Sequence, residues 1–177
     1  VETGCAETDF ETDFETACRL VHVEQDHIVN ANGMVMTPGY VDIHSHGAWG
    51  SSFDDGEKGI TTARAGHMAH GTTRQVLSLI TNPIDVICGN LKTVHDMMPD
   101  RPDILGAHLE GPFLAMPRKG AHDPNCLVDP TPDLVSRMLD AADGCLRQIT
   151  IAPELPHGID AIRRFFLAGV VPAVGHC

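Results

Sequence analysis

Short apolar segments alternate with segments of helical periodicity through most of this 177-residue chain. Strands alternating with helices of about 10–15 residues are typical of repeated βα units around a parallel sheet, so the pattern predicts an α/β fold. On the first predicted helix the inner face is expected to include Ile60, Ala63, Ala65, His67 and Met68. Strands are expected at residues 40–43, 75–80, 104–109, 147–151 and 170–174, and helices at 57–70, 82–98, 132–142 and 158–168.

Polar motifs follow the carboxyl ends of these predicted strands. A (β/α)8 barrel places its active site at those ends, and so does an open doubly wound sheet, so the pattern alone leaves both folds open. A glycine-rich nucleotide fingerprint follows none of the strands. A full barrel takes about 250 residues. We therefore expect residues 38–177 to form the first part of a barrel, in a chain that ends before the barrel closes.

The first 37 residues differ from the rest. Residues 1–19 are acidic and contain the repeated sequence Thr-Asp-Phe-Glu at 8–11 and 12–15, which predicts a mobile segment. Residues 20–29 and 34–36 are expected to be strands separated by a turn at Asn30–Gly33, because Asn and Gly tolerate positive φ. These strands would not belong to the parallel sheet.

Composition restricts the classes of partner. The chain has 12 basic and 24 acidic residues, a net charge of -12, which argues against a general nucleic-acid surface. Its six cysteines are scattered without a CxxC pair, which favours free thiols in a reducing compartment. Neither a signal peptide nor an apolar run of about 18 residues is recognised, so we expect a cytoplasmic protein without a membrane partner.

Candidate metal ligands lie at the ends of the first and third strands. His44 and His46 follow residues 40–43, and period-two alternation sends both imidazoles to one side. Glu110 ends the third strand beside Gly-Pro, where a carboxylate could bind a divalent ion. His108 precedes it on the same face and is predicted to orient ligands rather than to bind metal.

Three later motifs supply further candidates. Lys119 and His122 are predicted to bind the substrate from a loop rich in Pro and Gly, where His122 could donate a hydrogen bond to a sugar hydroxyl or carbonyl. Glu154 follows the fourth strand and is predicted to orient its neighbours. His176 follows the fifth strand and is a second imidazole ligand. Each signal is weak alone, but His, Glu and His at successive strand ends converge on one point in such a fold.

The motifs resemble the amidohydrolase superfamily and, within it, the N-acetylglucosamine-6-phosphate deacetylases. The stretch Pro38–Gly47 is similar to the first strand of the superfamily, and four later segments narrow the resemblance to the deacetylases over roughly residues 28–177. The Leu-Glu-Gly-Pro-Phe run followed by Lys-Gly-Ala-His is the most specific part. Those segments are His108–Leu114, Lys119–His122, Ala152–Glu154 and Gly175–His176.

The resemblance implies roles for these residues. Glu110 and His176 would be metal ligands, His122 would contact the substrate, and His44 and His46 would hold a second metal in members that keep this pair. It also implies that a second histidine ligand, the general-base aspartate and most phosphate contacts lie beyond Cys177. A small β-sandwich domain built from both chain ends is implied too, with residues 20–37 as part of it.

The implied reaction is hydrolysis of the acetamide of N-acetyl-D-glucosamine 6-phosphate to D-glucosamine 6-phosphate and acetate. One or two divalent ions are expected as cofactors, zinc first, with iron, manganese or cobalt as alternatives. The substrate is a small amino-sugar phosphate, and family members are often homodimers. Two alternatives stay open: another amidohydrolase, dihydroorotase-like or deaminase-like, and a non-catalytic fragment that binds metal or sugar phosphate. The chain alone is expected to show little or no activity.

Overall fold

The computed structural model describes residues 30–177, and the chain divides into two compact units, Val1–Pro38 and Gly39–Cys177. Residues 30–38 contain the predicted turn, where Asn32 and Gly33 have φ of 48° and 79°. The predicted strand at 34–36 was wrong: these residues are exposed and pair with no other strand among the described residues. The expectations for residues 1–29 lie outside the described residues, and the β-sandwich stays a prediction.

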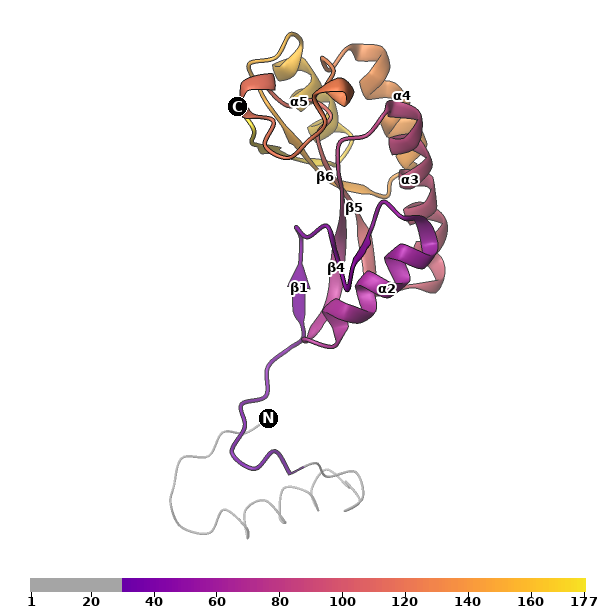
Figure 1. Ribbon diagram of the computed structural model, residues 1–177, viewed down its shortest axis with the longest axis vertical. Coiled ribbons are helices and arrows are strands. Elements are labelled where there is room, and N and C mark those ends of the chain that lie inside the picture. Colours follow the sequence, from indigo (N-terminus) through magenta and orange to yellow (C-terminus); the bar gives the residue numbers. More distant parts are fainter. Residues whose placement is uncertain (1–29) are drawn as a thin grey trace. The chain divides into compact units, whose positions relative to one another are not determined.

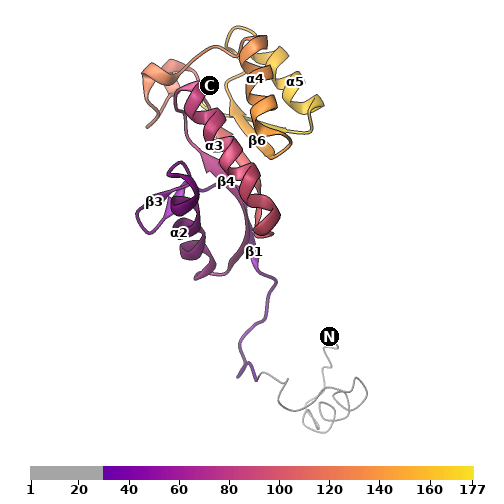
Figure 2. The ribbon, with the colours of Figure 1, turned by 90° about the vertical axis from the view of Figure 1, so that its right-hand side faces the viewer.

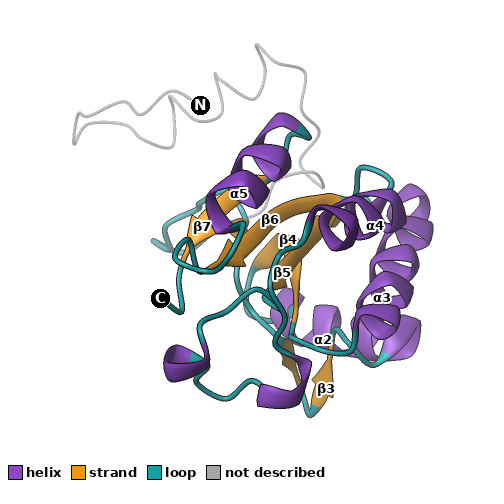
Figure 3. Ribbon diagram, turned by 90° about the horizontal axis from the view of Figure 1, so that it is seen from above, coloured by secondary structure: helices purple, strands orange, loops and turns teal. Residues whose placement is uncertain are grey.

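Residues 39–177 form a five-stranded sheet in which every neighbouring pair is parallel. The order β1-β4-β5-β6-β7 follows the chain, so each new strand adds to the same edge. The sheet curls along this order, which Figure 3 shows from one end. Its strands are β1 (Tyr40–Asp42), β4 (Thr72–Leu79), β5 (Ile104–Glu110), β6 (Leu146–Ile151) and β7 (Val171–Val174).

Four helices connect these strands and cover one face of the sheet (Figures 1 and 2). They are α2 (Gly56–Met68), α3 (Ile84–Met97), α4 (Pro132–Ala142) and α5 (Gly158–Leu167). Helix α4 begins where the sequence predicts, because Pro132 is preorganised for a first turn and the Thr131 side chain accepts a hydrogen bond from the Leu134 amide. The connections also contain η2 (Met98–Asp100), η3 (Met116–Arg118) and η4 (Pro124–Cys126).

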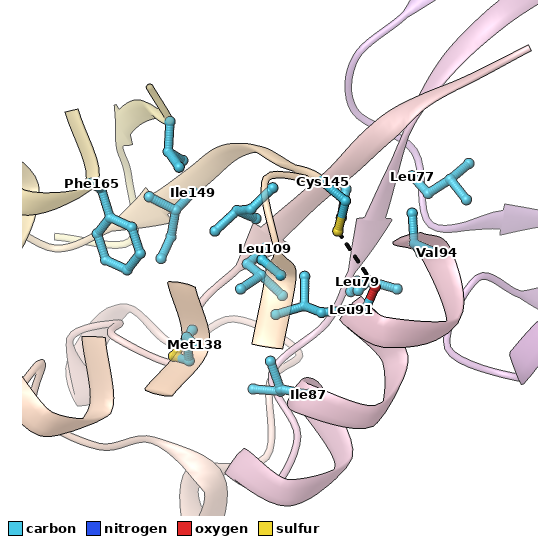
Figure 4. Close-up of a cluster of buried hydrophobic side chains, with 14 of the residues drawn as sticks. Leu77, Leu79, Ile87, Leu91, Val94, Leu109, Met138, Cys145, Ile149 and Phe165 are labelled. Carbon is cyan, nitrogen blue, oxygen red and sulfur yellow. Dashed lines mark hydrogen bonds between the residues drawn. The ribbon is translucent and has the colours of Figure 1, made fainter. Parts of the chain in front are cut away.

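The core lies between the sheet and the helices (Figure 4). Leu77 and Leu109 point from neighbouring strands toward the helices, and Leu91 and Phe165 meet them from α3 and α5. All four side chains are fully buried. Each contributes about 1.5–3 kcal/mol from removal of apolar surface from water, so this layer fixes the helices against the strands.

The inner face of α2 differs from the prediction. Ala65 and Met68 are exposed, whereas Arg64 and Gly66 are buried. Gly66 is needed because an added Cβ would lie 2.8 Å from the Cβ of Ala48. Arg64 is buried because its guanidinium finds partners, among them Asp103 at 2.9 Å. Apolar periodicity alone cannot predict that an arginine is buried in the core beside an acidic partner.

A short antiparallel hairpin that the sequence did not predict follows β1. It pairs β2 (Gly47–Ala48) with β3 (Ser51–Ser52), with Trp49 and Gly50 at positive φ in the turn. The two edge strands of the sheet, β1 and β7, expose apolar side chains such as Val41 and Val174. Among the described helices, none has both the length and the apolar character needed to cross a membrane.

Candidate metal centre

The segment after β1 carries the first two candidate ligands. The Asp42 carboxylate accepts a hydrogen bond from the His44 amide at 3.0 Å, which fixes the backbone where the strand ends. The Nε2 atoms of His44 and His46 lie 3.3 Å apart, so the two imidazoles meet at their tips. The period-two spacing therefore brings both rings to one side of the chain.

Glu110, at the end of β5, lies at the centre of the site. Its Oε2 is 2.9 Å from Nε2 of His46, and its Oε1 is 3.0 Å from Nε2 of His176. His44 and His122 lie at 3.6 and 3.5 Å from the same carboxylate. The hydrogen bond from His46 lowers the pKa of Glu110 far below its ordinary value, against the opposing effect of burial, and His176 adds to the lowering. Glu110 is therefore a carboxylate anion surrounded by imidazoles.

The orientation of His176 identifies which of its nitrogens is free to bind. Its Nδ1 lies 2.8 Å from the Arg118 carbonyl oxygen, which can only accept, so Nδ1 carries a proton. In the neutral imidazole, Nε2 then presents a lone pair to a carboxylate oxygen at 3.0 Å. Two acceptors at that distance need a cation between them, either a proton on the ring or a metal ion. The donor set therefore fits a divalent cation.

Two groups of three donors could hold such an ion. One consists of His44, His46 and Glu110, and the other of Glu110, His122 and His176, with the ligand atoms of each group within 4.8 Å of one another. Glu110 belongs to both groups, so its two oxygens could serve one cation or two. Imidazole nitrogens and a carboxylate form a set that suits zinc.

The pKa of His46 is raised, first by its hydrogen bond to Glu110, with burial opposing. Its other ring nitrogen, Nδ1, is buried and has no hydrogen-bond partner among residues 30–177. The ring is therefore held mainly through Nε2, the atom that faces Glu110.

His108 lies beneath this cluster and is fully buried. Its Nδ1 and Nε2 each lie 2.8 Å from a hydroxyl oxygen, that of Ser78 on β4 and that of Thr150 on β6. Burial is the main reason that its pKa is lowered to about 4, and the neighbouring His44 contributes to the lowering. Both ring nitrogens have a hydrogen-bond partner, and the lowered pKa keeps the ring neutral. The orienting role of His108 stays a prediction. Its ring centroid lies 4.6 Å from that of His44.

The loop after β5 places His122 and Lys119 differently. His122 is 8% exposed, and burial lowers its pKa while Glu110 opposes the lowering. The Lys119 ammonium donates to the carbonyl oxygens of Gly120 and His122 at 3.2 and 3.1 Å, so it stiffens its own loop. Glu154 is exposed in the turn after β6 and joins neither group of donors. The substrate role of Lys119 and the orienting role of Glu154 stay predictions.

A pocket of about 470 Å³ opens beside Glu110, His46 and His122. Its other walls come from the loop after β4, residues 80–83, and from the loop around Asp123 and Cys126. Asp54 fastens the first loop, accepting hydrogen bonds from the Ile80 amide at 3.1 Å and from the Asn82 side chain at 3.2 Å. Asp54 was not predicted from the sequence, although its acidic pair with Asp55 before a helix was a visible signal.

Comparisons with known proteins agree with the resemblance found in the sequence. No family model matches the chain. N-acetylglucosamine-6-phosphate deacetylase from Lysinibacillus sphaericus is 28% identical over 163 residues, covering 88% of this chain and 41% of the relative. The human enzyme of the same name is 29% identical over 163 residues, covering 83% and 38%. The chain therefore spans about two fifths of the length of these curated relatives.

Solved structures agree in fold. N-acetyl-D-glucosamine-6-phosphate deacetylase from Mycobacterium smegmatis is 41% identical with a TM-score of 0.75, covering 78% of this chain and 37% of that one. The Thermotoga maritima enzyme is 25% identical with a TM-score of 0.71, covering 78% and 37%. The predicted barrel portion is confirmed, and so is the resemblance: the chain is similar to N-acetylglucosamine-6-phosphate deacetylases over part of their length.

Proposed function

We propose that this site serves the metal-dependent hydrolysis of N-acetyl-D-glucosamine 6-phosphate to D-glucosamine 6-phosphate and acetate. The observation that carries the proposal is the single Glu110 carboxylate, surrounded by imidazoles, with His176 presenting Nε2 to it. A mutant of the Mycobacterium smegmatis deacetylase is described in complex with N-acetyl-D-glucosamine-6-phosphate, which supports this substrate class.

Glu110 and His176 would hold one divalent cation beside His122, and His44 and His46 would share Glu110 in holding a second. Zinc is the proposed ion, with iron, manganese or cobalt as alternatives. A bound cation of this kind lowers the pKa of water and polarises a carbonyl oxygen. The Arg118 carbonyl keeps the His176 ring in the tautomer that binding requires, as outer hydrogen bonds do for metal-bound histidines in general.

The pocket beside Glu110 would receive the acetamide. His122 forms part of its wall within reach of the carboxylate and could orient a sugar hydroxyl or the amide carbonyl. Lys119 would support this role by holding the backbone of the same loop. The resemblance assigns proton transfer to an aspartate that lies beyond Cys177 in the longer relatives. Without a general base, turnover typically falls by about 10²–10⁴-fold.

Zinc titration of the 177-residue chain tests the site. We expect bound zinc in a purified, dialysed sample, with retention that depends on Glu110 and His176. N-acetyl-D-glucosamine 6-phosphate should then bind in calorimetry more tightly with zinc than without it, and cyclic amides should not bind. If the Glu110→Gln and His176→Ala chains retained as much zinc as the unsubstituted chain, the proposed site would be refuted.

Acetate release tests the activity. The 177-residue chain with added zinc is expected to show little or no turnover. A chimera in which residues 38–177 replace the matching part of the Mycobacterium smegmatis deacetylase should release acetate, and the Glu110→Gln chimera should not. An inactive chimera that folds and binds zinc would count against the proposed reaction. We also propose a cytoplasmic location and a homodimeric assembly. Analytical ultracentrifugation tests whether the chain is a dimer.

A further inference from the structure

The Arg64 side chain is fully buried between α2 and the sheet. Its Nε donates to Asp103 at 2.9 Å, and one terminal nitrogen donates to the Thr72 carbonyl at 3.2 Å. The other terminal nitrogen donates to the side-chain oxygen of Gln75. Arginine has no acceptor, so the Gln75 amide must turn its oxygen toward Arg64.

That orientation decides what the other end of the Gln75 amide can do. Gln75 is also fully buried, on β4. With its oxygen toward Arg64, its NH2 group faces the end of β1 and the segment that follows it. There it donates to Asp42 Oδ2 at 3.3 Å and to the hydroxyl oxygen of Ser45. One buried side chain therefore contacts two residues that flank His44.

Asp42 and Ser45 in turn fix the backbone of the histidine pair. The second oxygen of Asp42 accepts from the His44 amide at 3.0 Å. The Ser45 amide donates to the Ser78 hydroxyl at 3.1 Å, and the Ser78 amide donates to the Ser45 carbonyl at 3.2 Å. By contrast, the His44 side chain is 45% exposed, and β1 is an edge strand.

We propose that Gln75 is a positioning residue for the two imidazoles of His44 and His46, acting through Asp42 and Ser45. The inference rests on the proposed metal site and names a residue that supports it without touching it. Arg64 sets the direction of the amide, and the amide sets the positions of the two polar groups beside His44. Outer hydrogen bonds of this kind typically change metal affinity by about 10–100-fold.

A double-mutant cycle on zinc affinity tests the link. In a His176→Ala background, the histidine pair and Glu110 are left as the complete group of three donors, and a chromophoric chelator reports its zinc dissociation constant. We expect Gln75→Leu to weaken zinc about 10–100-fold and Ser45→Ala to weaken it less. The double variant should be no weaker than Gln75→Leu alone, because both substitutions remove the same contact. Additive losses would overturn the route through Ser45.

Gln148→Leu is the matched control, because Gln148 lies on β6 and its side chain makes no hydrogen bond to the described residues. The zinc affinity of the Gln148→Leu chain should stay within about twofold of the background. Within residues 30–177, the Gln148 side-chain amide makes no hydrogen bond through which it could position a metal ligand. An equal loss in Gln75→Leu and Gln148→Leu would show a general packing effect and refute the inference.

Amide hydrogen exchange without metal separates this inference from the proposed function. Gln75→Leu and Ser45→Ala should both speed exchange at the His44 and Ser45 amides, while the amides of α5 keep their rates. If Gln75→Leu does not fold, Ser45→Ala alone decides. Should the unsubstituted chain bind no zinc, the proposed function fails, whereas the exchange comparison still supports or overturns the positioning role. Unchanged exchange at His44 in a folded variant would overturn it.

Discussion

Strand β5 has a carboxylate with several basic partners at each end, and the two ends are built differently. Asp103, just before the strand, pairs with Arg64 and Arg101 at 2.9 Å each. Glu110, its last residue, is surrounded by imidazoles. Guanidinium groups stay charged at any ordinary pH, whereas an imidazole can exchange a proton for a metal ion. The first end is suited to hold the fold together and the second to bind a cation.

Removing Arg64 should have the largest effect on stability. Arg64→Met is expected to lower the free energy of unfolding by about 3–5 kcal/mol, because it leaves Asp103, Gln75 and the Thr72 carbonyl short of a buried partner. Urea unfolding followed by circular dichroism measures this. A loss below about 1 kcal/mol would contradict the assigned role of this end of the strand.

Glu110→Gln should affect zinc binding more than stability. We expect zinc affinity to fall by about 100-fold, equivalent to about 2.7 kcal/mol, because both groups of donors share this carboxylate. The metal-free chain should unfold at a moderately lower urea concentration than the unsubstituted chain, because the hydrogen bonds that lower the pKa of Glu110 stabilise the folded carboxylate. Competition with a chelator measures the affinity, and Glu154→Gln, an exposed carboxylate outside both groups, is the control. Equal affinities for the two variants would contradict the comparison.

Acid should weaken the Asp103 end over a defined range. Burial raises the pKa of Asp103, but hydrogen bonds from Arg101 and Arg64 outweigh this and lower the pKa to about 2, from an ordinary 3.8. The unfolded chain therefore binds this proton first, so the stabilisation is present above about pH 3.8 and is lost as the pH falls through 2. It should amount to at most about 2 kcal/mol.

Urea unfolding of the unsubstituted chain and of Asp103→Asn at several pH values isolates this contribution. The difference in unfolding free energy between the two should shrink as the pH drops from 5 to about 2. A difference that stays constant over this range would mean that the arginines do not stabilise the Asp103 carboxylate.

Thr150→Val should have the smallest effect. It removes the hydroxyl beside Nε2 of His108 and leaves the shape of the side chain almost unchanged. We expect a loss of about 1 kcal/mol in unfolding free energy, the net value of one buried hydrogen bond. Thermal unfolding measures it, and Thr61→Val, at an exposed position of α2, provides the reference. A larger loss in zinc affinity than in stability would place His108 closer to the metal chemistry than its hydrogen bonds indicate.

The chemistry-bearing residues were accessible from the sequence because they follow strand ends. His44, Glu110 and His176 could be placed together since carboxyl ends of parallel strands meet at one rim. The pair formed by Arg64 and Asp103 could not be found in this way. It joins a helix to a loop, and an arginine on an apolar face gives no signal until its partner is known. Gln75 was hidden for the same reason.

The limits of periodicity appear at the chain's irregular parts. Residues 34–36 form a short apolar run that is compatible with a strand, but they lie exposed and pair with no strand among the described residues. The hairpin at Gly47–Ser52 was missed because its strands are two residues long. The helices were placed well where Pro or Thr marks their first turn, as at Thr131 and Pro132.

His44 and His176 follow the two outermost strands of the sheet, yet both reach the carboxylate of a middle strand, at 3.6 and 3.0 Å. The degree of curl therefore sets the spacing of the donors. We expect a cation that binds all of them to favour this curvature over a flatter one. Binding of the cation and curvature of the sheet would then be thermodynamically linked.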